Sequence, residues 1–93
     1  MSIESDSDLV KQIVDRFPEQ DQVCCVLFEF MHSDACVWYY ANQRRRADAL
    51  VAKRRSNFVW KQLKALANKH SVDYTGWKNQ IKEEVRFTYM DYF

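Results

Sequence analysis

The chain has 93 residues, of which 47% are hydrophobic and 29% are charged, and it contains one glycine and one proline. This length allows one domain with one core; the hydrophobic fraction excludes an intrinsically disordered chain, and the scarcity of turn residues excludes a β-sandwich or barrel. The longest strongly apolar run, residues 23–28, is too short to cross a bilayer, and the acidic first residues show no signal peptide. We therefore expect one soluble, intracellular, all-α domain over residues 1–93.

Charge is distributed unevenly along the chain. Residues 1–43 have a net charge of −6, residues 44–82 of +9 and residues 83–93 of −2, within a formal total of +1. A basic segment of this kind attracts polyanions even when the whole chain is nearly neutral. The alternative is that the acidic and basic segments face each other across the fold and neutralise one another.

The first expected helix covers residues 6–17. Asp6 or Ser7 provides its N-cap, and apolar side chains recur on one face as far as Phe17. Pro18 ends this helix, because the residue before a proline is disfavoured in the α conformation. Its acidic side chains offer a surface for a partner or a shield for the basic segment.

The second expected helix covers residues 20–32, whose dense apolar content is typical of a central helix buried on more than one face. Ser33 and Asp34 predict the end of this helix and a new cap. The aromatic segment 35–41 that follows is expected to form a helical turn or an ordered loop.

Two further helices are expected in the basic segment. Residues 44–55 lack helix breakers and carry a thin apolar stripe between two basic clusters. Ser56-Asn57 is expected to cap the next helix, whose apolar residues repeat with helical spacing until Lys69-His70 closes it.

The last helix is expected to begin at Ser71 or Asp73. Its apolar residues share one face, and Lys78, Lys82 and Arg86 follow at i, i+4 and i+8 on a neighbouring face. The whole sequence therefore predicts a small bundle of four to five helices. The residues expected on the apolar face are Tyr74, Trp77, Ile81, Val85 and Thr88 or Tyr89.

Catalytic and metal chemistry find little support in this sequence. One glycine excludes a glycine-rich phosphate loop, and His32 and His70 both lie near expected helix ends. Cys24, Cys25 and Cys36 are odd in number and lack the C-x₂-C spacing of a zinc site, so we expect buried free thiols. We expect no enzymatic activity, no catalytic residue, no metal and no cofactor.

Basic side chains at helical spacing favour nucleic-acid binding. The exposed face of a last helix can enter the major groove of double-stranded DNA, where Lys and Arg bind phosphates or guanine and Asn binds adenine. The basic clusters would contact phosphates, although a solvated surface or a nuclear-import-like signal would have the same composition. The candidate DNA-contacting residues are Arg44, Arg45, Arg46, Lys53, Arg54, Arg55, Lys78, Asn79, Lys82 and Arg86.

Residues 22–92 resemble the MADF domain, a helical DNA-binding domain of the Myb/SANT-like group. The similar motifs are Cys36-Val37-Trp38, then Val59-Trp60-Lys61-Gln62-Leu63-Lys64-Ala65-Leu66-Ala67, and finally Trp77-Lys78-Asn79-Gln80-Ile81-Lys82. The chain departs from the family in three ways: no proline precedes Trp38, the stretch from Trp38 to Trp60 is longer, and the last motif is one residue out of step. The helix at 6–17 has no clear counterpart, although the segment from Leu9 to Pro18 competes as the family's opening helix.

This resemblance implies a three-helix Myb/SANT-like core and a nuclear DNA-binding module of a transcription regulator or chromatin protein. The last helix would contact double-stranded DNA, and the basic clusters would contact phosphates. Domains of this group also bind proteins, so the resemblance leaves room for both kinds of partner.

The alternative is a protein-interaction module that binds no nucleic acid, such as an adaptor or a small viral or phage inhibitor. Its partner would bind the acidic N-terminal third or exposed aromatic residues, and a homodimer formed by acidic-to-basic contact is one version. A continuous positive surface would favour the first hypothesis, and exposed aromatic side chains the second. The aromatic candidates are Trp38, Tyr39, Tyr40, Tyr89, Tyr92 and Phe93.

Overall fold

The computed structural model describes residues 2–90 of the chain, with side chains from residue 8 to residue 87. This part of the chain forms four α-helices and no strand: α1 (Ser2–Val14), α2 (Gln20–Asn42), α3 (Arg46–Lys69) and α4 (Trp77–Met90). The prediction of an all-α bundle of four to five helices is therefore confirmed. Tyr92 and Phe93 lie outside the described residues, as does the side chain of Tyr89.

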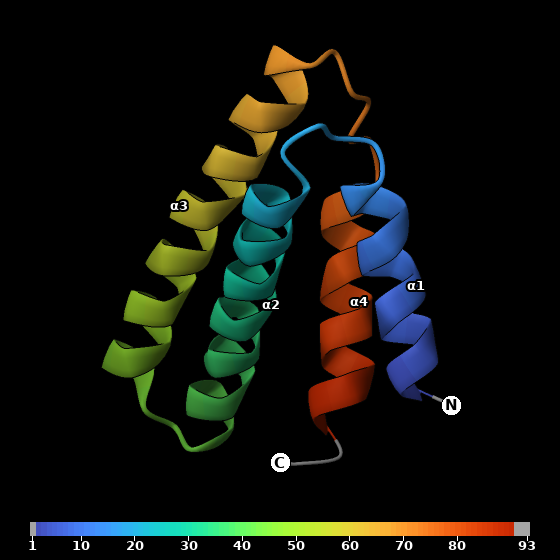
Figure 1. Ribbon diagram of the computed structural model, residues 1–93. Coiled ribbons are helices and arrows are strands. Elements are labelled where there is room, and N and C mark those ends of the chain that lie inside the picture. Colours follow the sequence, from blue (N-terminus) through green and yellow to red (C-terminus); the bar gives the residue numbers. More distant parts are fainter. Residues whose placement is uncertain (1, 91–93) are drawn as a thin grey trace.

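Helix α2 lies at the centre of the bundle (Figure 1). Helices α2 and α3 form a long antiparallel hairpin, α4 lies on the other side of α2, and α1 packs against both α2 and α4 (Figure 1). The backbone of α3 approaches that of α2 and neither α1 nor α4. Helices α3 and α4 therefore both pack on α2, and their backbones do not contact each other.

Two helix boundaries predicted within the long hairpin are wrong. Helix α2 continues through Ser33 and Asp34, and α3 continues through Ser56, because all three side chains are buried, at 3%, 5% and 4% exposure, and none caps a helix end. Ser and Asp favour caps through their short polar side chains, but packing overrides this preference inside a long hairpin. Segment 35–41 is consequently helical.

The two short helices also begin or end away from the predicted positions. Helix α1 begins at Ser2, so Asp6 and Ser7 lie within it, and it ends at Val14 rather than at Phe17. Helix α4 begins only at Trp77, because the carboxylate of Asp73 accepts hydrogen bonds from the Thr75 backbone N–H (2.9 Å) and hydroxyl (2.7 Å) and shapes a turn. Gly76 completes this turn with a φ of 82°, a conformation that glycine adopts without strain.

The hydrophobic core runs along α2. Phe30 meets Trp60 of α3 with ring centroids 5.4 Å apart, and Phe17 meets Trp77 of α4 at 6.0 Å. The apolar stripes predicted for the first helix, for the second half of α3 and for α4 as far as Val85 all face this core, which confirms their periodicity. The side chain of Thr88, predicted on the same face of α4, lies outside the described residues. The fully buried side chains of largest volume are Phe30, Leu27, Leu63, Ile81, Val23, Val59 and Val85.

Glu19 holds the connection between α1 and α2 against the end of α3. Its carboxylate pairs with Lys69 at 3.3 Å and with His70. Burial raises the pKa of Glu19, but the hydrogen bonds from His70 and Lys69 outweigh burial, so the pKa is lowered. This pair of contacts fixes one end of the long hairpin relative to α1.

Candidate nucleic-acid interface

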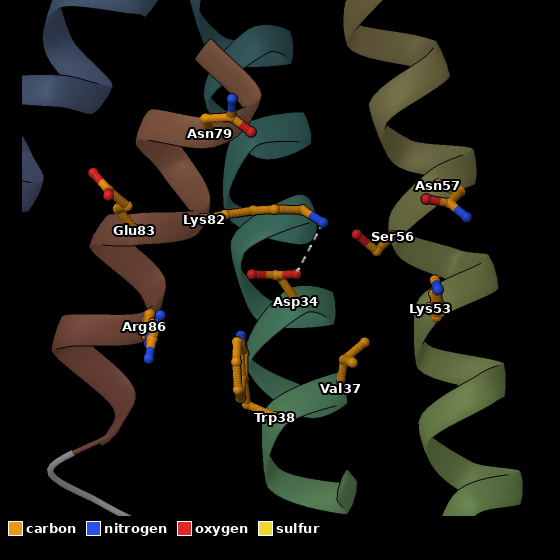
Figure 2. Close-up of a pocket in the computed structure, with 10 residues that line it drawn as sticks. All are labelled: Asp34, Val37, Trp38, Lys53, Ser56, Asn57, Asn79, Lys82, Glu83 and Arg86. Atoms are coloured by element: carbon orange, nitrogen blue, oxygen red, sulfur yellow. Dashed lines mark ion pairs between the residues drawn. The ribbon is translucent and has the colours of Figure 1, made fainter. Parts of the chain in front are cut away.

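A groove of about 540 Å³ lies between α3 and α4, with α2 as its floor. It exists because α3 and α4 both pack against α2 and stay apart from each other. Figure 2 shows side chains from all three helices directed toward this space. We call this hollow the α3–α4 groove. The residues that line it are Asp34, Val37, Trp38, Lys53, Ser56, Asn57, Asn79, Lys82, Glu83 and Arg86.

The two walls of the groove follow from helical spacing. On α4, Asn79, Lys82 and Arg86 lie at i, i+3 and i+7, which places them along one side of the helix. On α3, Lys53 and Asn57 lie at i and i+4 and face the same space. Four of the ten predicted DNA-contacting residues are therefore brought together in one groove: Lys53, Asn79, Lys82 and Arg86.

The floor of the groove carries a buried carboxylate. Asp34 is 5% exposed, and its Oδ1 lies 4.0 Å from the Lys82 amine, while its Oδ2 is buried without a hydrogen-bond partner among the described side chains. Burial raises the pKa of Asp34, and the positive charges of Lys82 and Lys78 oppose that shift. An acceptor with so few partners is costly to bury, so this residue is poised to accept a hydrogen bond.

Trp38 lies one helical turn beyond Asp34 on α2. Its side chain is 37% exposed, and the Arg86 guanidinium lies 5.6 Å from the centroid of its ring. The groove thus contains an aromatic surface beside a cation, an arrangement that suits planar ligands.

Lys78 does not line the groove. Its amine is 5.8 Å from the Trp60 ring centroid and is partly buried. Burial lowers the pKa of Lys78, and the neighbouring charges of Lys82 and Lys64 lower it further. The negative charge of Asp34 opposes this shift.

The positive surface continues toward the α2–α3 turn. A second hollow is lined by Arg44, Arg46 and Lys53, together with apolar side chains including Leu50. Lys53 borders both hollows, so it joins them. Arg44 adopts a φ of 59° in the turn. None of these three cations has an acidic partner among the residues that the structure describes.

Three of the predicted residues lie apart from this surface. Arg45 pairs with Asp48 at 2.7 Å and lies over the Tyr40 ring, and Arg55 pairs with Glu29 at 3.8 Å across the other side of the hairpin. Arg54 is exposed and lines neither hollow. The ten predicted residues therefore do not act as a single cluster.

The acidic N-terminal third neutralises part of the basic segment. The pairs that join the two segments are Glu19 with Lys69 and His70, Glu29 with Arg55, and Asp34 with Lys82. Of these, only Asp34 lies in the α3–α4 groove. The acidic and basic segments therefore contact each other at three places, as one alternative predicted. The groove itself is lined by three cations, Lys53, Lys82 and Arg86, and by two acids, Asp34 and Glu83.

Asp34 and Trp38 were not predicted from the sequence as nucleic-acid-contacting residues. Their i, i+4 spacing places them on one helix face, which would have suggested a shared location. The helix end predicted at Ser33-Asp34 hid this relation, because the two residues were assigned to different elements.

The three cysteines and His32 lie on α2, and His70 lies at the end of α3. All three cysteines are free, but Cys25 is exposed and Cys24 and Cys36 are only partly buried, so the prediction of buried thiols is wrong. Cys36 Sγ lies 3.6 Å from His32 Nε2. Among the described residues, no three His, Cys, Asp or Glu side chains gather as metal ligands would.

Within residues 2–90, no helix combines the length and apolar character needed to cross a membrane. Comparison of the chain with protein-family models, with curated proteins and with solved structures found no match. The resemblance to the MADF domain accordingly stays a prediction from the sequence.

Proposed function

We propose that this chain is a nuclear DNA-binding module of a transcription regulator or chromatin protein, and that the α3–α4 groove holds the DNA phosphate backbone. The observation that carries this proposal is the convergence of Lys53, Lys82 and Arg86 on one groove from two separate helices. Cations held along a groove release the counterions of a nucleic acid when they bind it, which is the main source of sequence-independent affinity.

The surface beyond the groove supports the same function. Arg44 and Arg46 extend the positive surface past Lys53, so several successive phosphates can be contacted. Phosphate contacts position a protein on nucleic acid, and polar side chains such as Asn57 and Asn79 then reach sugars or bases. The MADF-like motifs imply the same class of partner.

The location of the cations changes the role proposed for the last helix. Lys78 lies over Trp60 and Lys82 reaches toward Asp34, so neither projects from the outer face of α4. In this arrangement α4 forms one wall of a phosphate-binding groove, and α3 forms the other.

A matched pair of triple variants tests the proposal. The groove variant is Lys53→Gln, Lys82→Gln and Arg86→Gln; the flank variant is Lys11→Gln, Arg54→Gln and Arg55→Gln, which removes the same charge outside the groove. Fluorescence anisotropy at about 50 mM salt, with random-sequence DNA as duplex and as single strand, measures both affinities. We expect at least about a tenfold loss in the groove variant and less than about threefold in the flank variant.

Equal losses in the two variants, with both folded by circular dichroism, would show that net charge rather than the groove governs binding. Absence of binding to either form of DNA by the folded native chain would exclude the proposal.

A protein-interaction function is the second candidate, and the outer face of α2 favours it. Phe28 is 55% exposed and Tyr39 is 40% exposed on this face, with Cys25 and His32 exposed between or beside them. Exposed aromatic side chains are common in protein interfaces.

Sedimentation velocity over a wide concentration range tests self-association through this face. A dimer that is lost in Phe28→Glu but kept in Phe58→Glu, an equally exposed aromatic position on α3, would support the outer face of α2 as an interface. A monomer at all concentrations would exclude the homodimer.

A further inference from the structure

We propose that the α3–α4 groove binds single-stranded DNA and holds one unstacked base between Trp38 and Asp34, an inference that rests on the proposed function. The phosphates on either side of that base would contact Lys53, Lys82 and Arg86. The proposed function assigns only phosphate contacts to this groove. The inference adds that the DNA is single-stranded and that one base is preferred.

The carboxylate of Asp34 is unsatisfied at the floor of the groove. Its contact with Lys82 is loose, at 4.0 Å, and its other oxygen has no partner. The groove holds three cations and two acids, so it has little excess charge to attract a ligand cation, and the group that best fits this acceptor is a neutral N–H donor. The N–H groups on the pairing edges of nucleobases are such donors, and the attached phosphates suit the surrounding cations.

An aromatic surface lies beside this acceptor. Trp38 is partly exposed in the groove, and the Arg86 guanidinium lies next to its ring. Bases that leave the helical stack are held on aromatic rings and guanidinium planes, as in many proteins that bind single strands. Figure 2 shows Trp38 and Asp34 rising from the same helix into the same space.

The shape of the groove selects an unpaired base. The polar and aromatic groups lie on the floor of a groove whose walls are two helices, and its volume of about 540 Å³ is within the usual range for small-ligand sites. A base paired within a duplex is covered by its neighbours and cannot descend to this floor. An unpaired base can, because it rotates out of the strand.

The chemistry of Asp34 also predicts which base is preferred. Guanine presents two adjacent N–H donors on its pairing edge, which a carboxylate accepts well. Thymine presents one N–H between two carbonyl oxygens, and these oxygens are repelled by a carboxylate. We therefore expect guanine to be preferred over thymine at the position that enters the groove.

The experiment uses thymidine strands of about nine nucleotides, with and without one central guanine, and the guanine strand annealed to its complement. Anisotropy with the native chain is expected to give about tenfold tighter binding of the guanine strand than of the thymine strand or the duplex. In Asp34→Asn this preference should fall below about threefold, while the thymine strand binds at least as tightly because one negative charge is gone.

Trp38→Leu tests the stacking contact, with Phe58→Leu as its control because Phe58 is exposed outside the groove. We expect Trp38→Leu to lose about tenfold in affinity for both strands and Phe58→Leu to lose little. Circular dichroism verifies the fold of each variant.

Equal affinity of the native chain for the guanine and thymine strands would overturn the inference, as would a full preference retained in Asp34→Asn or identical behaviour of the two leucine variants. Any of these results with groove-dependent duplex binding would leave the proposed function standing. No binding to any strand or duplex would overturn both.

Discussion

Asp34 is the residue at which the proposed binding role and the stability of the fold make opposite demands. It lies at the floor of a positive groove, almost fully buried, with one loose ionic contact and one unpaired oxygen. Burying a charge with incomplete hydrogen bonding costs stability, even when cations are near. A residue of this kind is explained more readily by what it binds than by what it stabilises.

Replacement of Asp34 by Asn should therefore stabilise the free protein at pH 7, by about 1 kcal/mol. Burial raises the pKa of Asp34 in the folded state, so the folded protein binds a proton more readily than the unfolded chain. The native chain loses stability as pH rises from the ordinary Asp pKa through this raised value, and the benefit of Asn vanishes below that range.

Urea unfolding of both proteins at pH 7 and at pH 3.5 measures this difference. Destabilisation by Asn at pH 7 would mean that the Lys82 contact outweighs the cost of burying the carboxylate, which is the opposite of the expected result.

At the scale of the helices, the periodicity of apolar residues correctly predicted which helix faces are buried. Residue types that are typical of caps did not predict where the long helices begin and end. The stripes that end in Phe17 and that run through Leu63 and Ile81 are all in the core, because burial requires one continuous apolar face. Ser33 and Ser56 looked like boundaries because serine is favoured at caps. In the long α2–α3 hairpin these small side chains are instead buried, where little space is available.

Ser56→Ala distinguishes a buried residue in the middle of a helix from the N-cap that the sequence predicted at Ser56. In the middle of α3, alanine improves helix propensity and removes a buried hydroxyl, so unfolding free energy should stay within about 0.5 kcal/mol of the native value or increase. A true N-cap would lose about 1 kcal/mol or more on the same change. Urea unfolding decides between these outcomes.

At the scale of the whole molecule, the candidate site could be predicted only in part. The sequence contains the basic clusters and the spacing of Lys82 and Arg86, but it does not show that Lys53 faces them across α2. That relation depends on how α3 and α4 pack on a common helix. It also depends on which side of α3 each cation faces, and for this reason Arg45 and Arg55 lie apart from the groove.

The fold therefore separates the cations that are neutralised by acidic residues from those that are not, a distinction that the order of charges along the sequence does not show. Acidic residues of the first third neutralise cations near the α1–α2 connection and on the outer side of the hairpin. The α3–α4 groove and the neighbouring hollow retain cations with few acidic partners among the described residues. A chain with little net charge therefore presents a localised positive surface, which is the property that binding to a nucleic acid requires.

The role of the α3–α4 groove is tested most directly by the salt dependence of DNA binding, measured for the native chain and for the groove and flank triple variants. Loss of three phosphate contacts should reduce the slope of log affinity against log salt concentration by about two to three in the groove variant, and by less than about one in the flank variant. The same reduction in both variants, or no salt-dependent binding by the folded native chain, would contradict the assignment of the α3–α4 groove as a nucleic-acid interface.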